Sequence, residues 1–208
     1  MSVTTEKAAA IIGRIAVVIE ENKQYLSDLD QQIGDGDHGF NMARGFEAVM
    51  AKLSAQASTE MGELLKTTAM ALISNVGGAS GPLYGTLVLK MAGAVGSAAE
   101  FNLAIFTQAF KAGVLGVQER GKAVLGEKTM LDVLIPVLEL FEKEAAAGTD
   151  AKTAFADAAA LAEKCVLETK DKIATKGRAA YLGERSKGHV DPGAASACLI
   201  IQTIAREL

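Results

Sequence analysis

The strongest constraint on the fold of this chain is a helical spacing of apolar residues that continues along nearly its whole length. In the first such segment, residues 5–26, apolar side chains recur three or four positions apart and therefore fall on one face of a helix. No segment shows a convincing strand pattern, so we expect an all-α fold in one domain. The same spacing predicts further helices over 38–53 and 59–76, from Ser80 or Gly81, after Asn102, from Thr129, over 149–174 and from Asp191 to Arg206.

Capping residues support several of these helix boundaries. Asn102 is a favourable N-cap for the helix that follows it, and Asp191 with Pro192 is an N-cap followed by proline in the first turn. Thr129 and Asp132 resemble a capping box in which Asp replaces the usual Glu. These signals predict where the helices begin more sharply than the apolar spacing does.

The overall composition limits the class of protein. Half of the residues are hydrophobic and 22% are charged, which supplies a large core but too much charge for a membrane protein. The net charge of -4 argues against a nucleic-acid partner, because little basic surface is left to neutralise phosphates. The histidines, His38 and His189, and the cysteines, Cys165 and Cys198, are too few for the usual zinc site or a disulfide framework. We therefore expect a cytoplasmic protein with buried, unpaired cysteines.

One uncharged stretch, residues 67–89, is long enough to span a bilayer. Its middle, residues 75–82, is rich in glycine and contains Pro82, which would interrupt a membrane helix. The N-terminus also lacks the basic start of a signal peptide, and Arg14 interrupts its first apolar run. We expect two buried helices joined by a turn, and no membrane segment.

Two long segments lie outside the predicted helices, and they differ in charge. Residues 27–37 are rich in Asp and Gly, whereas residues 175–190 are rich in Lys, Arg and Gly. Long irregular segments in a compact domain are usually functional or disordered. An acidic and a basic loop together suggest a site for a metal ion and an anion, although a basic loop that is simply solvated remains an alternative.

The acidic segment 28–39 carries the densest chemical signal. Crowded carboxylates repel one another unless a cation neutralises them, and their oxygens select Mg²⁺ or Ca²⁺. Counted from Asp35, the calcium helix–loop–helix pattern fails, because Phe40 and Phe46 occupy the positions of its glycine and glutamate. Mg²⁺ is the better match. In the alternative interpretation, Asp35 and Asp37 only cap the helix that follows.

Three glycine-rich motifs differ in what they indicate. Residues 34–39 match G-x-G-x-x-G, but no strand precedes them and their aspartates would repel a pyrophosphate. Residues 116–123 approach the P-loop pattern, but no Ser or Thr follows Lys122. The turn at 77–82 leaves two interpretations open: its backbone N–H groups hold an anion at a helix N-terminus, or it is only a tight helical hairpin.

Five short blocks carry a family resemblance when they are taken in order. They are Gly-Asp-Gly-Asp-His-Gly with Asn41, Gly-Gly-Ala-Ser-Gly-Pro at 77–82, Gly-Glu-Lys-Thr-Met at 126–130, the stretch 177–186, and Asp-Pro-Gly at 191–193. Each block alone is weak, but five in this order are specific. Over the chain from about Leu29 to its end, the sequence resembles the nucleotide-binding L subunit of dihydroxyacetone kinases.

The resemblance implies a fold and a site. The fold is a closed barrel of eight antiparallel amphipathic helices, formed by residues 1–208 as one domain, with the nucleotide among the loops at one rim. The cofactors are ADP or ATP and two Mg²⁺ ions, held by Asp30, Asp35 and Asp37. Arg178 is the implied catalytic residue, which neutralises charge in the transition state. The implied nucleotide contacts are His38, Gly39, Asn41, Ala79, Ser80, Gly121, Met130, Arg178, Asp191, Pro192 and Gly193.

The resemblance also implies partners. In one branch of the family the L unit is fused to a dihydroxyacetone-binding unit and uses free ATP. In the other branch it stands alone, with resident ADP, and a length of 208 residues favours this branch. The implied partners are then a phosphohistidine protein of the sugar phosphotransferase system, which recharges the ADP, and a separate K subunit that holds dihydroxyacetone.

Two functions of other classes remain open. The chain could be a regulatory module whose nucleotide state controls its contact with a transcription regulator. It could instead be a lipid-binding helical barrel related to the fatty acid kinases, because a ring of apolar helices can enclose a lumen.

Overall fold

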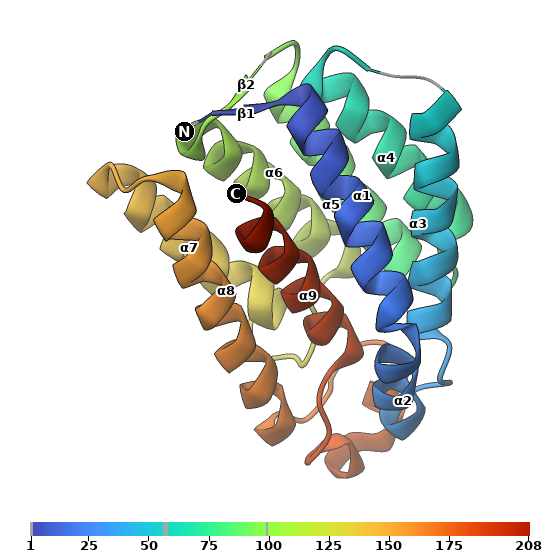
Figure 1. Ribbon diagram of the computed structural model, residues 1–208. Coiled ribbons are helices and arrows are strands. Elements are labelled where there is room, and N and C mark those ends of the chain that lie inside the picture. Colours follow the sequence, from blue (N-terminus) through green and yellow to red (C-terminus); the bar gives the residue numbers. More distant parts are fainter. Residues whose placement is uncertain (1, 56–57, 99) are drawn as a thin grey trace.

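A computed structural model describes residues 2–55, 58–98 and 100–208 of the chain, and in these ranges the fold is built almost entirely from helices (Figure 1). Two short 3-10 segments, η1 (Thr169–Asp171) and η2 (Arg178–Ser186), separate the last two α-helices. The α-helices are α1 (Thr5–Glu21), α2 (Lys23–Ile33), α3 (His38–Ala55), α4 (Met61–Asn75), α5 (Ser80–Val95), α6 (Leu103–Gly121), α7 (Leu131–Ala147), α8 (Ala151–Glu168) and α9 (Pro192–Glu207). The all-α prediction for one domain is therefore confirmed.

The predicted N-caps hold the starts of two helices. The side chain of Asn102 accepts a hydrogen bond from the backbone N–H of Ile105 at 2.9 Å, at the start of α6. The side chain of Asp191 accepts from the N–H of Ala194 at 2.7 Å, at the start of α9. Each cap satisfies an N–H group that has no partner within its helix.

The predicted extent of the first helix was wrong. The helix is interrupted at Asn22, and a second helix, α2, continues to Ile33. The Asn22 side chain donates a hydrogen bond to the carbonyl of Val18 at 2.8 Å, so the break leaves this carbonyl satisfied. Residues 27–33, which we expected in an acidic loop, are helical as a result. The structure also ends α8 at Glu168 rather than at residue 174.

A short strand pair also departs from the prediction of no strands. Val3–Thr4 (β1) and Glu100–Phe101 (β2) pair antiparallel, with Val3 opposite Phe101. The pair is only two residues long and leaves the helical class of the fold unchanged.

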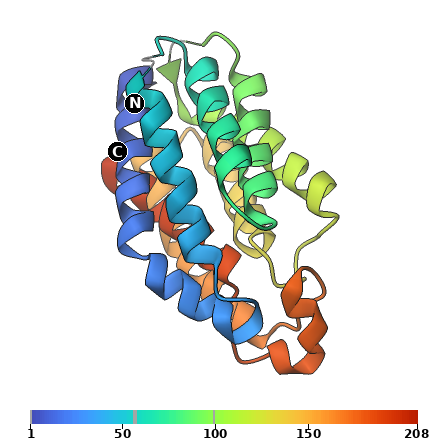
Figure 2. The ribbon, with the colours of Figure 1, turned by 90° about the vertical axis from the view of Figure 1, so that its right-hand side faces the viewer.

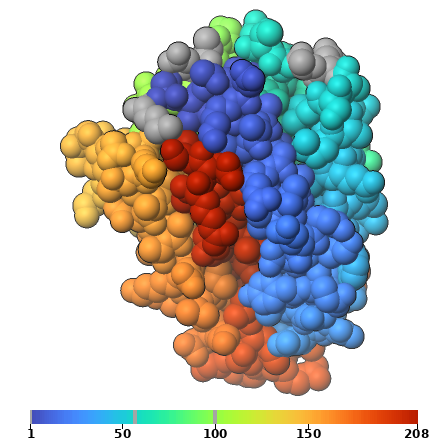
Figure 3. Space-filling model, viewed as in Figure 1, coloured from blue at the N-terminus to red at the C-terminus, as the bar shows by residue number. Residues whose placement is uncertain are grey.

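The contacts between the long helices follow the order of the chain and close into a ring. In the described part of the chain, α1 packs against α3, α3 against α4, and each later helix against its successor as far as α9, which packs against α1. Figure 3 shows α9 filling the seam between α8 and α1 on one face of the molecule. The helix α2 continues beyond the end of α1 and contacts α3, α9 and η2.

Small residues allow neighbouring helices to approach closely. A Cβ on Gly113 of α6 would lie 2.8 Å from the carbonyl oxygen of Leu87 on α5, so only glycine fits at this crossing. The apolar faces of the helices meet in one continuous core, in which Phe106, Phe141 and Phe155 pack ring against ring.

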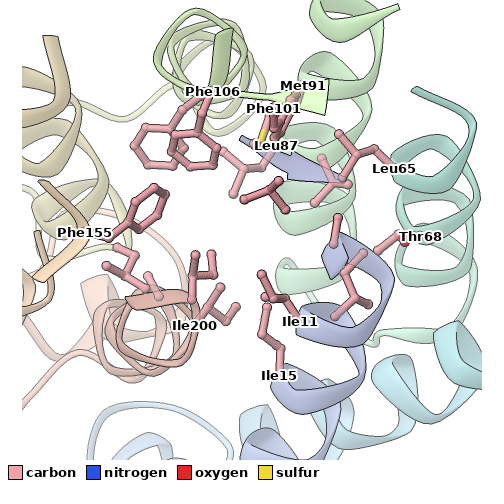
Figure 4. Close-up of a pocket in the computed structure, with 18 of the residues that line it drawn as sticks. Ile11, Ile15, Leu65, Thr68, Leu87, Met91, Phe101, Phe106, Phe155 and Ile200 are labelled. Atoms are coloured by element: carbon pink, nitrogen blue, oxygen red, sulfur yellow. The ribbon is translucent and has the colours of Figure 1, made fainter. Parts of the chain in front are cut away.

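The core also contains an apolar cavity of about 180 Å³ (Figure 4). Side chains from opposite sides of the molecule point into it, among them Ile11 of α1, Leu87 of α5, Phe155 of α8 and Ile200 of α9.

The uncharged stretch 67–89 is divided between α4 and α5, as predicted. Among the described residues, no helix combines the length and the apolar character that a membrane crossing requires.

Candidate functional site

A cleft of about 770 Å³ lies at one end of the helices, where several loops meet. Its walls come from the α2–α3 turn, the α4–α5 turn, the α6–α7 loop, the η2 segment and the start of α9. Figure 2 shows η2, in orange-red, at the foot of the molecule together with α2, and the two elements are in contact. The fold thus brings the predicted acidic and basic loops to the same end of the domain.

Most of the residues predicted for the site line this cleft. Gly39 and Asn41 are exceptions: both are buried in the first turn of α3 and lie outside the lining. The predicted residues in the lining are Asp30, Asp35, Asp37, His38, Ala79, Ser80, Gly121, Met130, Arg178, Asp191, Pro192 and Gly193.

Three aspartates form a carboxylate cluster on one wall of the cleft. One oxygen from each of Asp30, Asp35 and Asp37 lies within 4.8 Å of the others. Asp30 reaches the cluster from the last turn of α2, past Gly34, where a Cβ would lie 2.1 Å from an Asp30 carboxylate oxygen. A set of hard oxygen ligands at this spacing fits a divalent cation such as Mg²⁺.

The hydrogen bonds at the start of α3 bear on the alternative that these aspartates are only helix caps. Asp30 accepts from the N–H groups of Asp37 at 3.0 Å and His38 at 3.2 Å. The next two N–H groups, of Gly39 and Phe40, donate to the hydroxyl of Ser27 at 3.1 and 3.3 Å. In the described part of the chain, the N–H groups at the start of α3 are therefore satisfied without the side chains of Asp35 and Asp37.

The electrostatics of Asp30 agree with a cation-binding role. Burial raises the pKa of Asp30, and the nearby charges of Asp35 and Asp37 raise it further, whereas the hydrogen bonds from the backbone of His38 and Asp37 lower it. The repulsion among the carboxylates is a cost that a bound cation removes.

Arg178 at the start of η2 faces this cluster. Its guanidinium nitrogen lies 2.8 Å from a carboxylate oxygen of Asp35, and its side chain remains 70% exposed. The arginine is thus within reach of whatever the carboxylates hold, while most of its surface stays accessible.

Buried His38 links three helices through hydroxyl groups. Its Nδ1 lies 3.0 Å from the Ser80 hydroxyl of α5, and its Nε2 lies 2.9 Å from the Ser196 hydroxyl of α9. Ser196 in turn lies 2.7 Å from the hydroxyl of Tyr84. Burial lowers the pKa of His38 to about 4, so the imidazole is neutral at pH 7 and acts as a hydrogen-bonding partner that orients Ser80 at the cleft.

One helix N-terminus supplies further N–H groups at the cleft. The α5 helix begins at Ser80 after Ala79, and this start has no side-chain cap. The start of α7 is closed instead, because the N–H of Leu131 donates to the Thr129 hydroxyl at 3.2 Å and the N–H of Asp132 donates to the Thr129 carbonyl at 2.9 Å. Uncapped N–H groups at a helix start favour an anion. Lys176 of the predicted basic loop also lines the cleft, as does Arg120, which was not among the predicted site residues.

Asp191 caps α9 at the far side of the cleft, where it is almost fully buried. Burial raises its pKa to about 7; the charge of Asp132 raises it further, while the N–H of Ala194 and the charge of Lys128 lower it.

Lys128 of the α6–α7 loop and Asp132 in the first turn of α7 are buried charged residues. The predicted pairing of Asp132 with Thr129 is present, but the burial of the two charges was missed by sequence reasoning. The Asp132 carboxylate accepts from the N–H groups of Gly126 at 2.8 Å and Thr129 at 2.7 Å, and from the ammonium of Lys172 at 2.5 Å. Lys128 is almost completely buried beside it. Lys128 lies in the Gly-Glu-Lys-Thr-Met block, which is the signal that could have found it, but charged residues are usually exposed, so neither residue was expected inside.

An all-helical domain whose cleft combines clustered carboxylates, an arginine and an uncapped helix start is suited to a phosphorylated ligand with a divalent cation. Comparison with known families assigns the fold more narrowly: the model of the DAK2 domain matches residues 32–206, and the chain belongs to this family.

Relatives with assigned names extend this result. The chain is 42% identical over 205 residues to the ADP-binding subunit DhaL of the PEP-dependent dihydroxyacetone kinase of Escherichia coli (strain K12), covering 99% of this chain and 98% of the relative. It is 46% identical over 186 residues to the corresponding subunit of kinase 1 of Listeria innocua, covering 89% and 88%. Among solved structures, the dihydroxyacetone kinase from C. freundii in complex with AMP-PNP and Mg²⁺ matches with a TM-score of 0.75 and 22% identity, over 96% of this chain. The chain spans 33% of that longer protein.

Proposed function

We propose that this chain is the ADP-binding subunit of a PEP-dependent dihydroxyacetone kinase. The strongest comparative support is the Escherichia coli subunit of that name, which the chain matches over nearly the full length of both proteins. The structural observation that carries the proposal is the carboxylate cluster of Asp30, Asp35 and Asp37 facing Arg178 across one cleft.

Asp30, Asp35 and Asp37 would hold two Mg²⁺ ions with the nucleotide phosphates. Bound there, Mg²⁺ supplies charge neutralisation to the phosphate oxygens, which is the main electrostatic requirement of phosphoryl transfer. The donor set supports this assignment, because carboxylates that are not needed to cap α3 lie close enough to share an ion.

The chain's own groups have distinct roles in this proposal. Arg178 is the catalytic residue, since its guanidinium can stabilise charge that develops on the transferred phosphoryl group. The start of α5 offers N–H groups to the phosphates, and neutral His38 orients the Ser80 hydroxyl. The remaining proposed contacts are Gly39, Asn41, Ala79, Gly121, Met130, Asp191, Pro192 and Gly193, of which Gly39 and Asn41 act from behind the cleft wall.

We further propose that residues 1–208 form one nucleotide-binding domain, a closed barrel of eight antiparallel helices in which α2 extends α1. The returning order of helix contacts supports the barrel. The nucleotide then lies at one rim, and the rim stays accessible to partners.

The proposal includes two protein partners and a reaction cycle. A phosphohistidine-carrying protein of the phosphotransferase system phosphorylates resident ADP to ATP, and a separate K subunit that binds dihydroxyacetone receives the phosphoryl group. The names of the relatives, which include the words PEP-dependent and ADP-binding subunit, support this division of labour. Contact with a transcription regulator and a cytoplasmic location remain predictions from the sequence.

A direct experiment tests the central proposal. The purified protein is denatured, and the released small molecules are analysed by mass spectrometry and metal analysis. We expect ADP and Mg²⁺ in stoichiometric amounts, and phosphoryl transfer to dihydroxyacetone only when a K subunit and the phosphate donor are both present. Transfer from the ATP-loaded chain to dihydroxyacetone without a K subunit would contradict the proposed division of labour.

One observation favours a second candidate function, that of a lipid-binding helical barrel. The cavity inside the core is lined by apolar side chains from most of the helices and has a volume of about 180 Å³. Organic extraction of the folded protein, followed by mass spectrometry, tests this candidate: a co-purifying acyl chain supports it, and its absence from protein extracted under native conditions argues against it.

A further inference from the structure

Lys128 is a charged residue for which the proposed function gives no role. The residue is only 1% exposed, although it lies in the α6–α7 loop and borders the cleft. Its backbone has φ +60°, in the left-handed region that residues other than glycine seldom adopt. A lysine that is buried in such a backbone conformation persists only where its contacts compensate for both costs.

The contacts of its ammonium group are all to the main chain. Lys128 Nζ donates to the carbonyl oxygens of Thr169 at 2.7 Å, Lys172 at 3.2 Å and His189 at 2.5 Å. An ammonium has three N–H donors, so these bonds use all of them. The three N–H donors of the Lys128 ammonium are therefore all used within the protein, and none is left for a phosphate.

These three carbonyls flank one segment, residues 173–188, at its two ends. Thr169 and Lys172 precede the segment, His189 follows it, and Arg178 lies in η2 between them. A second bond closes the same junction, because the N–H of Gly188 donates to the carbonyl of Lys170 at 2.7 Å. Lys128 thus joins both ends of the loop that carries Arg178 and fixes them to the α6–α7 loop.

We propose that Lys128 is a positioning residue for Arg178. The ammonium of Lys128 holds the base of segment 173–188 closed, so that the guanidinium of Arg178 stays opposite the carboxylate cluster. The proposal rests on the catalytic role given to Arg178 in the proposed function. Without the ammonium, three buried carbonyls lose a donor, and the carboxylates of Asp132 and Asp191 lose a favourable charge. The loop then opens while the helices remain packed.

The first test measures amide hydrogen exchange of the full chain in Lys128→Met and in Lys128→Gly. The glycine variant removes the same ammonium but suits φ +60°, so it keeps the test available where the methionine variant fails to fold. We expect exchange across residues 173–188 to accelerate by at least about tenfold, a shift of about 1.4 kcal/mol in local opening, with α3 to α6 unchanged. Lys170→Met, which removes an exposed ammonium at the same junction, is the matched control and leaves the exchange unchanged.

The second test asks whether Lys128 acts through Arg178. Transfer from the loaded chain to dihydroxyacetone on a K subunit is measured for Lys128→Met, Arg178→Met and the double variant. We expect the single Lys128 variant to be at least about tenfold slower, since a small misplacement of a catalytic group has effects of this size, and the double variant to be no slower than Arg178→Met alone.

The outcomes separate this proposal from the proposed function. Unchanged exchange in both Lys128 variants, or rate losses that multiply in the double variant, would overturn the role of Lys128. Absence of any transfer by the wild-type protein would instead count against the proposed function, and the exchange experiment alone would then decide whether Lys128 closes the loop.

Discussion

The guanidinium of Arg178 lies 2.8 Å from the carboxylate of Asp35, which ties η2 to the α2–α3 turn across the cleft. Asp35 also belongs to the cluster proposed to bind Mg²⁺. The arginine and the metal site therefore share one carboxylate, and the following predictions separate their contributions.

Replacing Arg178 should affect catalysis far more than stability. The Arg178 side chain is 70% exposed, and exposed ion pairs contribute little to folding, so Arg178→Met should change the free energy of unfolding by less than about 0.5 kcal/mol. Loss of a group that stabilises transition-state charge should slow phosphoryl transfer by about 100-fold or more. Single-turnover transfer and urea unfolding check the two parts, with Arg185→Met, an exposed arginine of the same segment, as control. Full activity in Arg178→Met would remove its catalytic assignment.

The carboxylates should be needed for metal-dependent nucleotide binding. Asp35→Ala and Asp37→Ala should each weaken ADP binding in the presence of Mg²⁺ by at least about tenfold, because each removes a proposed metal ligand. EDTA should have the same effect on the wild-type protein. Isothermal titration calorimetry measures the affinity, and Asp28→Ala, which removes an exposed aspartate of α2 outside the cleft, is the control. Stoichiometric ADP retained by both variants would exclude the metal assignment.

A single methyl group at Gly34 should disturb the same site. The Cβ of Gly34→Ala would lie 2.1 Å from a carboxylate oxygen of Asp30, so the carboxylate must move out of the cluster. We expect weaker Mg²⁺-dependent ADP binding in this variant. Gly93→Ala is a matched control in α5, where an added Cβ meets no atom within 4 Å and should stabilise the helix by about 0.4–1 kcal/mol. Equal ADP affinity in the two variants would show that the position of Asp30 does not matter.

Asp191 should make stability depend on pH. Its folded-state pKa is raised to about 7 from an ordinary value of 3.8, so the folded protein holds this proton more tightly than the unfolded chain. The contribution of Asp191 is therefore complete below about pH 4 and is lost as the pH rises toward 7. Asp191→Asn keeps an N-cap acceptor but cannot ionise.

Urea unfolding of the wild type and this variant at pH 5 and pH 8 measures the effect. We expect the variant to gain stability relative to the wild type on going from pH 5 to pH 8. A difference between the two proteins that stays constant over this range would show that Asp191 does not titrate there.

Local signals predicted the starts of helices but not the break at Asn22. The side chains of Asn102 and Asp191 cap helices as their sequence context indicated, because N-cap chemistry depends on neighbouring residues. The break at Asn22 carries no proline or glycine, and the apolar spacing continues through it. Residues 27–33 of the following helix, α2, were taken for part of a loop.

For the site, too, the sequence predicted some residues and missed others. The carboxylate cluster and Arg178 were predicted as parts of one site, because Asp35, Asp37 and Arg178 lie in recognisable blocks of sequence, and the structure brings them together. The role of Lys128 was not predictable, because its partners are main-chain carbonyls 41 to 61 positions away in the sequence. For Asp132, the local bond with Thr129 was predicted as part of a capping box, but the ion pair with distant Lys172 was not. Such partners leave no mark on a single sequence.

The packing of α9 against α1 has a consequence for how the molecule assembles. The two helices are far apart in the chain, yet they form one seam of the ring, where Glu207 lies within 4 Å of the charged groups of Lys7 and Arg14. Side chains of both helices line the cavity, so contacts between α1 and α9 close the core along this side. Contacts of such long sequence separation slow folding. A circular permutant that joins α9 to α1 and opens the chain at another loop would make these contacts local, and should refold faster.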